Sequence, residues 1–197
     1  LGVDRGVAVT RVEDDGKTAA GVAPGVETEP SLASVENIGI SDEDVVHVSG
    51  ADLISEAGAR VLVHWVLGLP KRTTVVLAAT PAIALVDPQI LTELLARVDI
   101  LTMNIRGAAV LSNILADIPG VGSVSAALKK GATVVRRKGK LGCIITQDDK
   151  DVAEIPAYTT TVVDTSGVGD THVGVMCAAL LQGYSLVEAC RRANAGA

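Results

Sequence analysis

The sequence of 197 residues contains no phenylalanine and few other aromatic residues, namely Trp65, Tyr158 and Tyr184. Hydrophobic residues nevertheless make up 48% of the chain, so the core must be built from valine, isoleucine, leucine and alanine. A chain of this size can bury a substantial core, most simply as one domain with at most a small appendage. Little aromatic surface is available for stacking on a purine.

Positive charge, long apolar runs and paired cysteines are also scarce. The formal net charge of -6 argues against a general nucleic-acid or anionic-membrane binder. No apolar run approaches the roughly 20 residues of a membrane-spanning helix, and no signal sequence opens the chain, so the cytoplasm is the expected compartment. Cys143, Cys177 and Cys190 form no C-x-x-C pair and are expected to be buried thiols. The first residue is Leu1 rather than methionine, which indicates a fragment.

Hydrophobic periodicity predicts two kinds of structure along the chain. Residues 7–12 and 17–22 flank a polar turn and predict a β-hairpin. From residue 44 onward, strand and helix patterns alternate, which predicts an α/β fold with a mostly parallel sheet covered on both faces. We expect strands at 45–49, 75–79 and 98–103 and a hairpin over 132–155. We expect helices at 55–67, from 88, at 107–115 and at 123–130, and two near the end of the chain.

Three of these helices carry a capping signal at their N-terminus. Ser55 precedes the first, Asp87 is followed by a proline at the first helical position, and Ser185 stands three residues before Glu188.

The most informative segment is DTSGVGD at residues 164–170. Residues 155–163 before it are rich in β-branched side chains and predict a strand, and residues 171–181 after it predict a helix. Gly167 and Gly169 would let a phosphate approach the backbone. The first amides of the helix, those of Val168, Gly169 and Asp170, together with the helix dipole favour negative charge. Asp170 at the mouth of this anion site could accept a proton from an attacking hydroxyl.

Two other phosphate-binding motifs fit the sequence less well. A dinucleotide-binding fingerprint would need a third glycine at position 172, where the chain has His172. Gly16-Lys17-Thr18 looks like the end of a Walker loop, but Arg11 stands where the first glycine belongs. An ordinary glycine-rich turn in which Asp170 caps the helix is the remaining structural alternative. The three histidines have no metal-ligand spacing and are expected to be structural or exposed.

The segment DTSGVGDTHVG resembles the second signature of the ribokinase-like (PfkB) family of carbohydrate kinases, DTxGxGD. The resemblance extends over residues 75–111 and 134–145. It implies a ribokinase-like three-layer αβα sandwich with a small β lid, in which residues 1–27 are an incomplete part of the lid and residues 28–197 are a core truncated at both ends. It also implies that Asp170 is the catalytic base and that Gly167, Val168 and Gly169 hold the transferring phosphoryl group.

The same resemblance implies further roles. Asn104 corresponds to the asparagine of the family's N-x-x-E motif near the nucleotide phosphates, and Gly139 and Gly142 correspond to the glycines of T-x-G-x-x-G that pass close to ATP. Asn194 is similar to a position beside the adenine. In several family members the DTxGxGD loop also binds a monovalent cation, a K⁺ site that would fall on Asp164 and Ser166.

The chain departs from the family pattern at two positions. Gly107 replaces the glutamate that helps to organise Mg²⁺, so the handling of that metal is in question. Arg137 occupies the threonine position of T-x-G-x-x-G, where it is a candidate for phosphate contacts. By charge alone, residues 136–142 would be a solvated basic turn.

The sequence therefore predicts a cytoplasmic, ATP- and Mg²⁺-dependent sugar kinase whose acceptor is a ribose-like sugar or a ketose. Its partners would be small molecules, with no nucleic acid or membrane, and a homodimer formed through the lid is a further expectation. The alternative is a non-catalytic relative that binds a sugar or nucleotide as a sensor or scaffold, which Gly107 and Arg137 favour.

Overall fold

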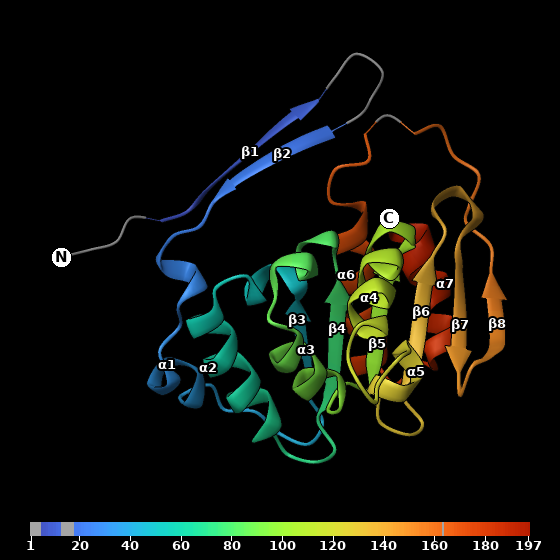
Figure 1. Ribbon diagram of the computed structural model, residues 1–197. Coiled ribbons are helices and arrows are strands. Elements are labelled where there is room, and N and C mark those ends of the chain that lie inside the picture. Colours follow the sequence, from blue (N-terminus) through green and yellow to red (C-terminus); the bar gives the residue numbers. More distant parts are fainter. Residues whose placement is uncertain (1–4, 13–17, 163) are drawn as a thin grey trace.

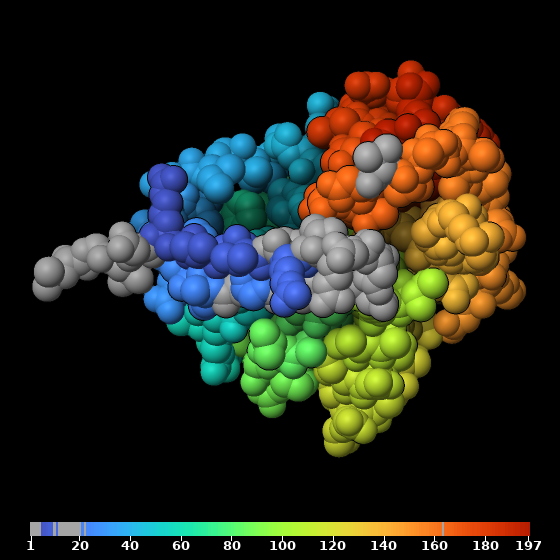
Figure 2. All heavy atoms as spheres, turned by 90° about the horizontal axis from the view of Figure 1, so that it is seen from above, coloured from blue at the N-terminus to red at the C-terminus, as the bar shows by residue number. Residues whose placement is uncertain are grey.

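The computed structural model describes residues 5–12, 18–162 and 164–197, which form two separate sheets (Figure 1). The smaller sheet pairs β1 (Val7–Val12) with β2 (Thr18–Ala23) in antiparallel register. The predicted N-terminal hairpin is therefore confirmed. It stands over the upper edge of the larger sheet in Figure 1 and crosses that edge when seen from above in Figure 2.

The larger sheet has six strands in the order β3-β4-β5-β6-β7-β8. The first four strands are parallel, β7 is antiparallel to β6, and β8 is antiparallel to β7, so the predicted mostly parallel sheet is confirmed. Its strands are β3 (Val45–Ser49), β4 (Thr74–Ala79), β5 (Ile100–Asn104), β6 (Thr133–Arg137), β7 (Cys143–Gln147) and β8 (Lys150–Ile155).

Helices cover both faces of this sheet (Figure 1). The front layer contains α2 (Glu56–Leu67), α3 (Pro88–Leu95), α4 (Ile105–Ala116) and the short α5 (Val124–Ala127), and the back layer contains α6 (Val168–Leu181) and α7 (Leu186–Gly196). α1 (Leu32–Glu36) leads from the hairpin into the core, and short 3₁₀ turns occupy Val26–Thr28, Gly50–Leu53, Pro81–Leu85 and Gly139–Leu141. Each face of the sheet has its own aliphatic cluster, as expected from the absence of phenylalanine. None of the helices in the described part of the chain has the length and apolarity needed to cross a membrane.

The local capping signals of the sequence are confirmed. Ser55 accepts a hydrogen bond from the amide of Gly58, Asp87 caps α3 ahead of its proline, and Ser185 accepts from the amide of Glu188. A side-chain acceptor at the N-cap satisfies an amide that the helix itself leaves free. These three helices therefore begin where the sequence predicts.

Two predicted elements are wrong. The β-branched run predicted as a strand at 155–163 is not one over its described part, because β8 ends at Ile155 and residues 156–162 have no regular structure; residue 163 lies outside the described residues. Pro156 has no amide to donate to a neighbouring strand. The helix predicted at 123–130 is only one turn long, since Leu128 already has an extended backbone with φ −81° and ψ 150°.

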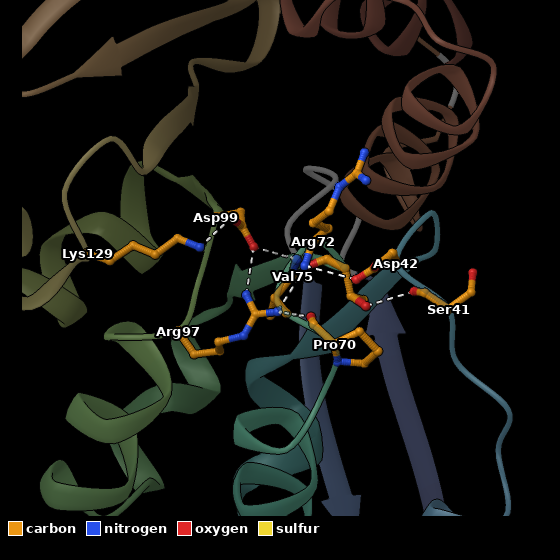
Figure 3. A network of polar contacts seen from close by, with 9 residues as sticks. Ser41, Asp42, Pro70, Arg72, Val75, Arg97, Asp99 and Lys129 are labelled. Carbon is orange, nitrogen blue, oxygen red and sulfur yellow. Dashed lines mark hydrogen bonds and ion pairs between the residues drawn. The ribbon is translucent and has the colours of Figure 1, made fainter.

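Polar contacts join the loops at the amino ends of the parallel strands (Figure 3). One oxygen of Asp99 accepts from the Val75 amide and from Arg97 Nη1, each at 2.9 Å, and the other pairs with Lys129. Arg97 Nη2 also donates to the carbonyl of Thr73 at 2.9 Å. This Asp99 network lies at the edge of the sheet opposite to the segment 164–170. It therefore stabilises the fold and takes no part in the candidate site.

Candidate functional site

The predicted site residues gather at the carboxyl edge of the parallel strands. Asn104 is the last residue of β5 and Arg137 the last residue of β6, and the two are register partners. The segment after β8 crosses this edge and enters α6 at Val168 (Figure 1). Loops at the carboxyl ends of parallel strands are where α/β sheets bind ligands.

The first turn of α6 has free amides at two of the three residues for which the sequence predicted them. Gly167 caps the helix in the left-handed conformation, with φ 72° and ψ −1°, and no side chain caps the turn. The first helical bond runs from Thr171 N to Gly167 O at 2.8 Å, and Val168 N makes only a long 3.4 Å contact with Thr165 O. Among the described residues, the amides of Gly169 and Asp170 have no hydrogen-bond acceptor. These donors and the helix dipole can hold an anion.

Arg137 lies directly against this turn. A Cβ atom at position 169 would come within 2.6 Å of Arg137 Nη1, so with glycine at that position the guanidinium packs directly against the turn. The Nε atom of Arg137 is buried and has no hydrogen-bond partner among the described residues. Burial lowers the pKa of Arg137, while the nearby carboxylate of Asp170 raises it. The two predicted residues thus share one electrostatic environment, which the sequence spacing of 33 positions does not reveal.

Asp170 itself is exposed in the first turn of α6. His47, in the middle of β3, adds a group that the sequence analysis expected to be structural or exposed. Its side chain is exposed at this end of the molecule but crowded enough that desolvation lowers its pKa, against the opposing charges of Asp52 and Asp170. The alternation of β3 predicts that residues 45, 47 and 49 share a face, but not that this face is turned toward α6.

The predicted cation loop is held by a local hydrogen bond. Ser166 N donates to Asp164 Oδ1 at 2.8 Å, and this bond, supported by the Ser166 side chain, lowers the pKa of Asp164. Both residues are exposed. The described residues contain no group of three or more His, Cys, Asp or Glu side chains that could hold a metal ion.

The predicted nucleotide loop connects β6 and β7. Gly139 and Gly142 have positive φ angles of 58° and 87°, and Lys138 N donates to Gly142 O at 2.7 Å. A Cβ atom at Gly142 would lie 2.0 Å from the carbonyl oxygen of Ile155. Gly142 therefore lets the loop pack against the end of β8, whereas a Cβ at Gly139 would meet nothing within 4 Å.

Asn194 links α7 to the rest of the back layer. Its Nδ2 donates to the carbonyls of Ile155 and Pro156, both at 3.1 Å, and its Oδ1 lies 3.1 Å from His172 Nε2. His172 is buried, and its other ring nitrogen has no partner among the described residues. The amide of Asn194 is thus engaged in holding the wall of the predicted nucleotide pocket, and a contact with adenine stays a prediction.

The cysteines are free thiols, as predicted. Cys143 and Cys190 are buried and Cys177 is half-buried. Hydrogen bonding with Cys190, and then with His172, lowers the pKa of Cys143, while the hydrogen bond with Cys143 raises the pKa of Cys190.

Asn104 and Gly107 lie together in the first turn of α4, at the positions that correspond to the asparagine and glutamate of N-x-x-E. Asn104 Oδ1 accepts from Gly107 N at 2.7 Å and so caps α4. A Cβ atom at Gly107 would lie 2.1 Å from the carbonyl oxygen of Ala79, so the first turn of α4 rests on the end of β4. A side chain at this position would require α4 or the end of β4 to shift, and Gly107 provides no carboxylate to organise Mg²⁺.

A cavity of about 510 Å³ lies elsewhere, on the α4 side of β6. Met103, Ala108 and Arg136 are among the residues that line it, and it contains none of the predicted site residues. The predicted site is instead an open edge of the sheet, at the ends of β5 and β6 and the first turn of α6.

Known proteins are similar to this chain over nearly its whole length. It is 28% identical over 195 residues to the uncharacterized sugar kinase YegV of Escherichia coli, covering 98% of this chain and 60% of that protein. The crystal structure of a ribokinase from Thermotoga maritima matches with a TM-score of 0.75 at 19% identity, covering 99% of this chain and 62% of that one. A nucleoside kinase of Methanocaldococcus jannaschii matches with a TM-score of 0.71 at 17% identity, covering 98% and 60%.

These matches identify the fold and the family. The structural neighbours show that the three-layer core and its mostly parallel sheet have the ribokinase-like fold. The chain spans about three fifths of the length of these relatives. The family model for pfkB carbohydrate kinases matches residues 4–197. The chain therefore belongs to the pfkB family of carbohydrate kinases.

Proposed function

We propose that this protein transfers the γ-phosphoryl group of ATP to a primary hydroxyl of a small carbohydrate, a ribose-like sugar or a ketose. The observation that carries the proposal is the first turn of α6, where free amides, the guanidinium of Arg137 and the carboxylate of Asp170 adjoin one another. Such a turn can hold a phosphoryl group and remove a proton within one helical turn. Because ATP is the donor, we place the reaction in the cytoplasm.

In the proposed reaction, ATP lies along the loop of Gly139 and Gly142 with its terminal phosphoryl group at the amides of residues 167–170. Asp170 takes the proton of the acceptor hydroxyl as its oxygen attacks phosphorus in line, and ADP leaves with the electrons of the broken bond. Phosphoryl transfer depends mainly on positioning and on charge stabilisation. Both are available here without a covalent intermediate.

Metal ions enter this proposal only with the substrate or at the cation loop. ATP would arrive as its Mg²⁺ complex, and no step depends on a metal held by position 107, where glycine has no carboxylate. The Asp164 and Ser166 turn is proposed to bind K⁺, supported by the exposed carboxylate at its entrance.

The hairpin of β1 and β2 is proposed to be part of a lid over the acceptor. Its position above the carboxyl edge of the sheet supports this role (Figure 2). Val7 and Val9 on β1 are 59% and 63% exposed, which is consistent with a second lid packing against the hairpin in a homodimer.

The test of the kinase proposal is ADP release by the full-length protein with MgATP and a panel of pentoses, ketohexoses and nucleosides. Asp170→Asn should lower turnover roughly 10²- to 10⁴-fold, as expected for loss of a general base, and should leave MgATP binding intact. Asp117→Asn is the matched control, because Asp117 is an exposed aspartate at the C-terminal end of α4, away from the candidate site. Turnover by Asp170→Asn close to that of the wild type would refute the assignment.

A non-catalytic binding relative is the second candidate, favoured by the absence of a carboxylate at Gly107. It predicts measurable MgATP binding with no ADP release on any acceptor in the panel. The same assay therefore separates the two functions.

A further inference from the structure

The basic residues at the end of β6 and just after it lie on different faces of the sheet. Arg136 Nη2 donates to Asp151 Oδ1 at 2.8 Å and to Thr146 at 3.2 Å. Lys138 Nζ pairs with Glu154 at 2.9 Å. Successive side chains of a strand point to opposite faces, so Arg137 alone is directed at α6.

Arg137 differs from these neighbours in having no anionic partner. Among the described residues, no carboxylate lies within ion-pair distance of its guanidinium, and its Nε is buried without an acceptor. A half-buried cation of this kind is unfavourable unless an anion joins it. The free amides of the α6 turn lie against the same guanidinium. The amides and the guanidinium can therefore bind the same anion.

We propose that Arg137 donates hydrogen bonds to the phosphoryl group during its transfer and neutralises the charge that develops on it. The inference rests on the proposed kinase function and assigns the cation of that site. Its second support is Gly107, where the Cβ clash with Ala79 excludes the metal-organising glutamate. A site without that carboxylate needs another source of positive charge, and a planar guanidinium suits phosphoryl oxygens.

In this proposal, Arg137 stabilises negative charge and Asp170 accepts the proton. The bond from the acceptor oxygen to the γ-phosphorus forms, the bond from that phosphorus to the bridging oxygen breaks, and the proton goes to Asp170. Arg137 stays protonated throughout and gains strength of interaction only as charge spreads over the phosphoryl oxygens. Its loss should therefore lower kcat more than it raises the KM for MgATP.

The variants to compare are Arg137→Met, Arg137→Lys and Arg136→Met in the full-length protein. Arg137→Met should reduce kcat roughly 10²- to 10³-fold, as for removal of one preorganised donor in other enzymes. Arg137→Lys should recover about a tenth or more of the activity because it keeps the charge but not the fork geometry. Arg136→Met removes the adjacent cation from the other face and should change kcat less than about twofold.

A binding measurement without turnover accompanies the kinetics. The probe is MgADP with aluminium fluoride, which imitates the transferring group, compared with MgADP alone in calorimetry. Wild-type protein should bind the fluoride complex more tightly than MgADP, and Arg137→Met should lose that difference while keeping its affinity for MgADP. Because the buried Nε has no partner to lose, the melting temperature of Arg137→Met should stay near that of the wild type.

The outcomes distinguish this inference from the kinase proposal. Active wild-type enzyme together with an Arg137→Met variant that keeps its kcat and its fluoride response would overturn the role of Arg137 and leave the kinase standing. A wild-type protein that is inactive on every acceptor, but whose fluoride response depends on Arg137, would overturn the kinase and support the anion site. Neither turnover nor a fluoride response would overturn both.

Discussion

Replacing Gly107 by alanine tests why this chain lacks the family glutamate. Gly107 is the buried third residue of α4, and a Cβ atom there would lie 2.1 Å from the carbonyl oxygen of Ala79 and 3.2 Å from its carbon. The atoms that a Cβ would meet belong to the backbone of β4, which is held within the parallel sheet. We therefore expect α4, rather than β4, to move. Movement of α4 also disturbs the 2.7 Å cap from Gly107 N to Asn104.

The magnitude follows from three opposing effects. Alanine in place of a helical glycine gains about 0.5–1 kcal/mol. Overpacking costs about 1–3 kcal/mol, and weakening the cap costs up to about 1 kcal/mol. The net expectation is a loss of up to about 3.5 kcal/mol in the free energy of unfolding, with a central value of about 2 kcal/mol. Urea titration of the full-length protein, followed by circular dichroism, measures it through the midpoint and slope.

The matched control is Gly174→Ala on the exposed side of α6. A Cβ there would meet nothing within 4 Å, so this variant should gain about 0.5–1 kcal/mol. The two substitutions are chemically identical and should have opposite signs. A Gly107→Ala variant as stable as Gly174→Ala would show that α4 yields freely, and the packing explanation for the missing glutamate would be refuted.

Two further predictions concern the opposite edge of the sheet and the site's histidine. Asp99→Asn should lower the free energy of unfolding by about 1–3 kcal/mol, because it weakens several charged hydrogen bonds. The control Glu56→Gln, which breaks an exposed ion pair within a helix, should cost at most about 0.5 kcal/mol. Equal losses in urea titrations of the two variants would contradict the stabilising role of the Asp99 network. The pKa of His47 is lowered from its ordinary 6.5, so its neutral form contributes stability above that pH, and the contribution is lost as the pH falls through the lowered value. His47→Gln should therefore flatten the decline of unfolding free energy below pH 6.5, and an unchanged decline would argue against a desolvated ring.

The parts of the fold that the sequence predicted are those with local causes. Capping by Ser55, Asp87 and Ser185 depends on residues within one turn, and the alternation of strands with helices reflects burial on both faces of a sheet. The failures have tertiary causes. The β-branched run after Ile155 has no neighbouring strand to pair with, and the helix from Ser123 stops early where the chain brings Lys129 to the Asp99 network.

The candidate site was predictable as a list of residues but not as an arrangement. The signature at 164–170 suggested that both glycines serve a bound phosphate, yet the two have different structural reasons. Gly167 adopts a positive φ of 72°, while Gly169 makes room for Arg137 from a strand 32 positions earlier. No local pattern reports such an approach, because it depends on how β6 and α6 meet.

The two departures from the family pattern act in the same electrostatic direction. Gly107 in place of glutamate removes a negative charge beside Asn104, and Arg137 in place of threonine adds a positive charge on its register partner. A site that needs positive charge for phosphoryl transfer can take it from a metal held by carboxylates or from a guanidinium. With no room for a side chain at Gly107, an aligned Arg137 is the simpler source. The absent glutamate and the unexpected arginine then compensate each other, and together they favour an active kinase over a non-catalytic relative.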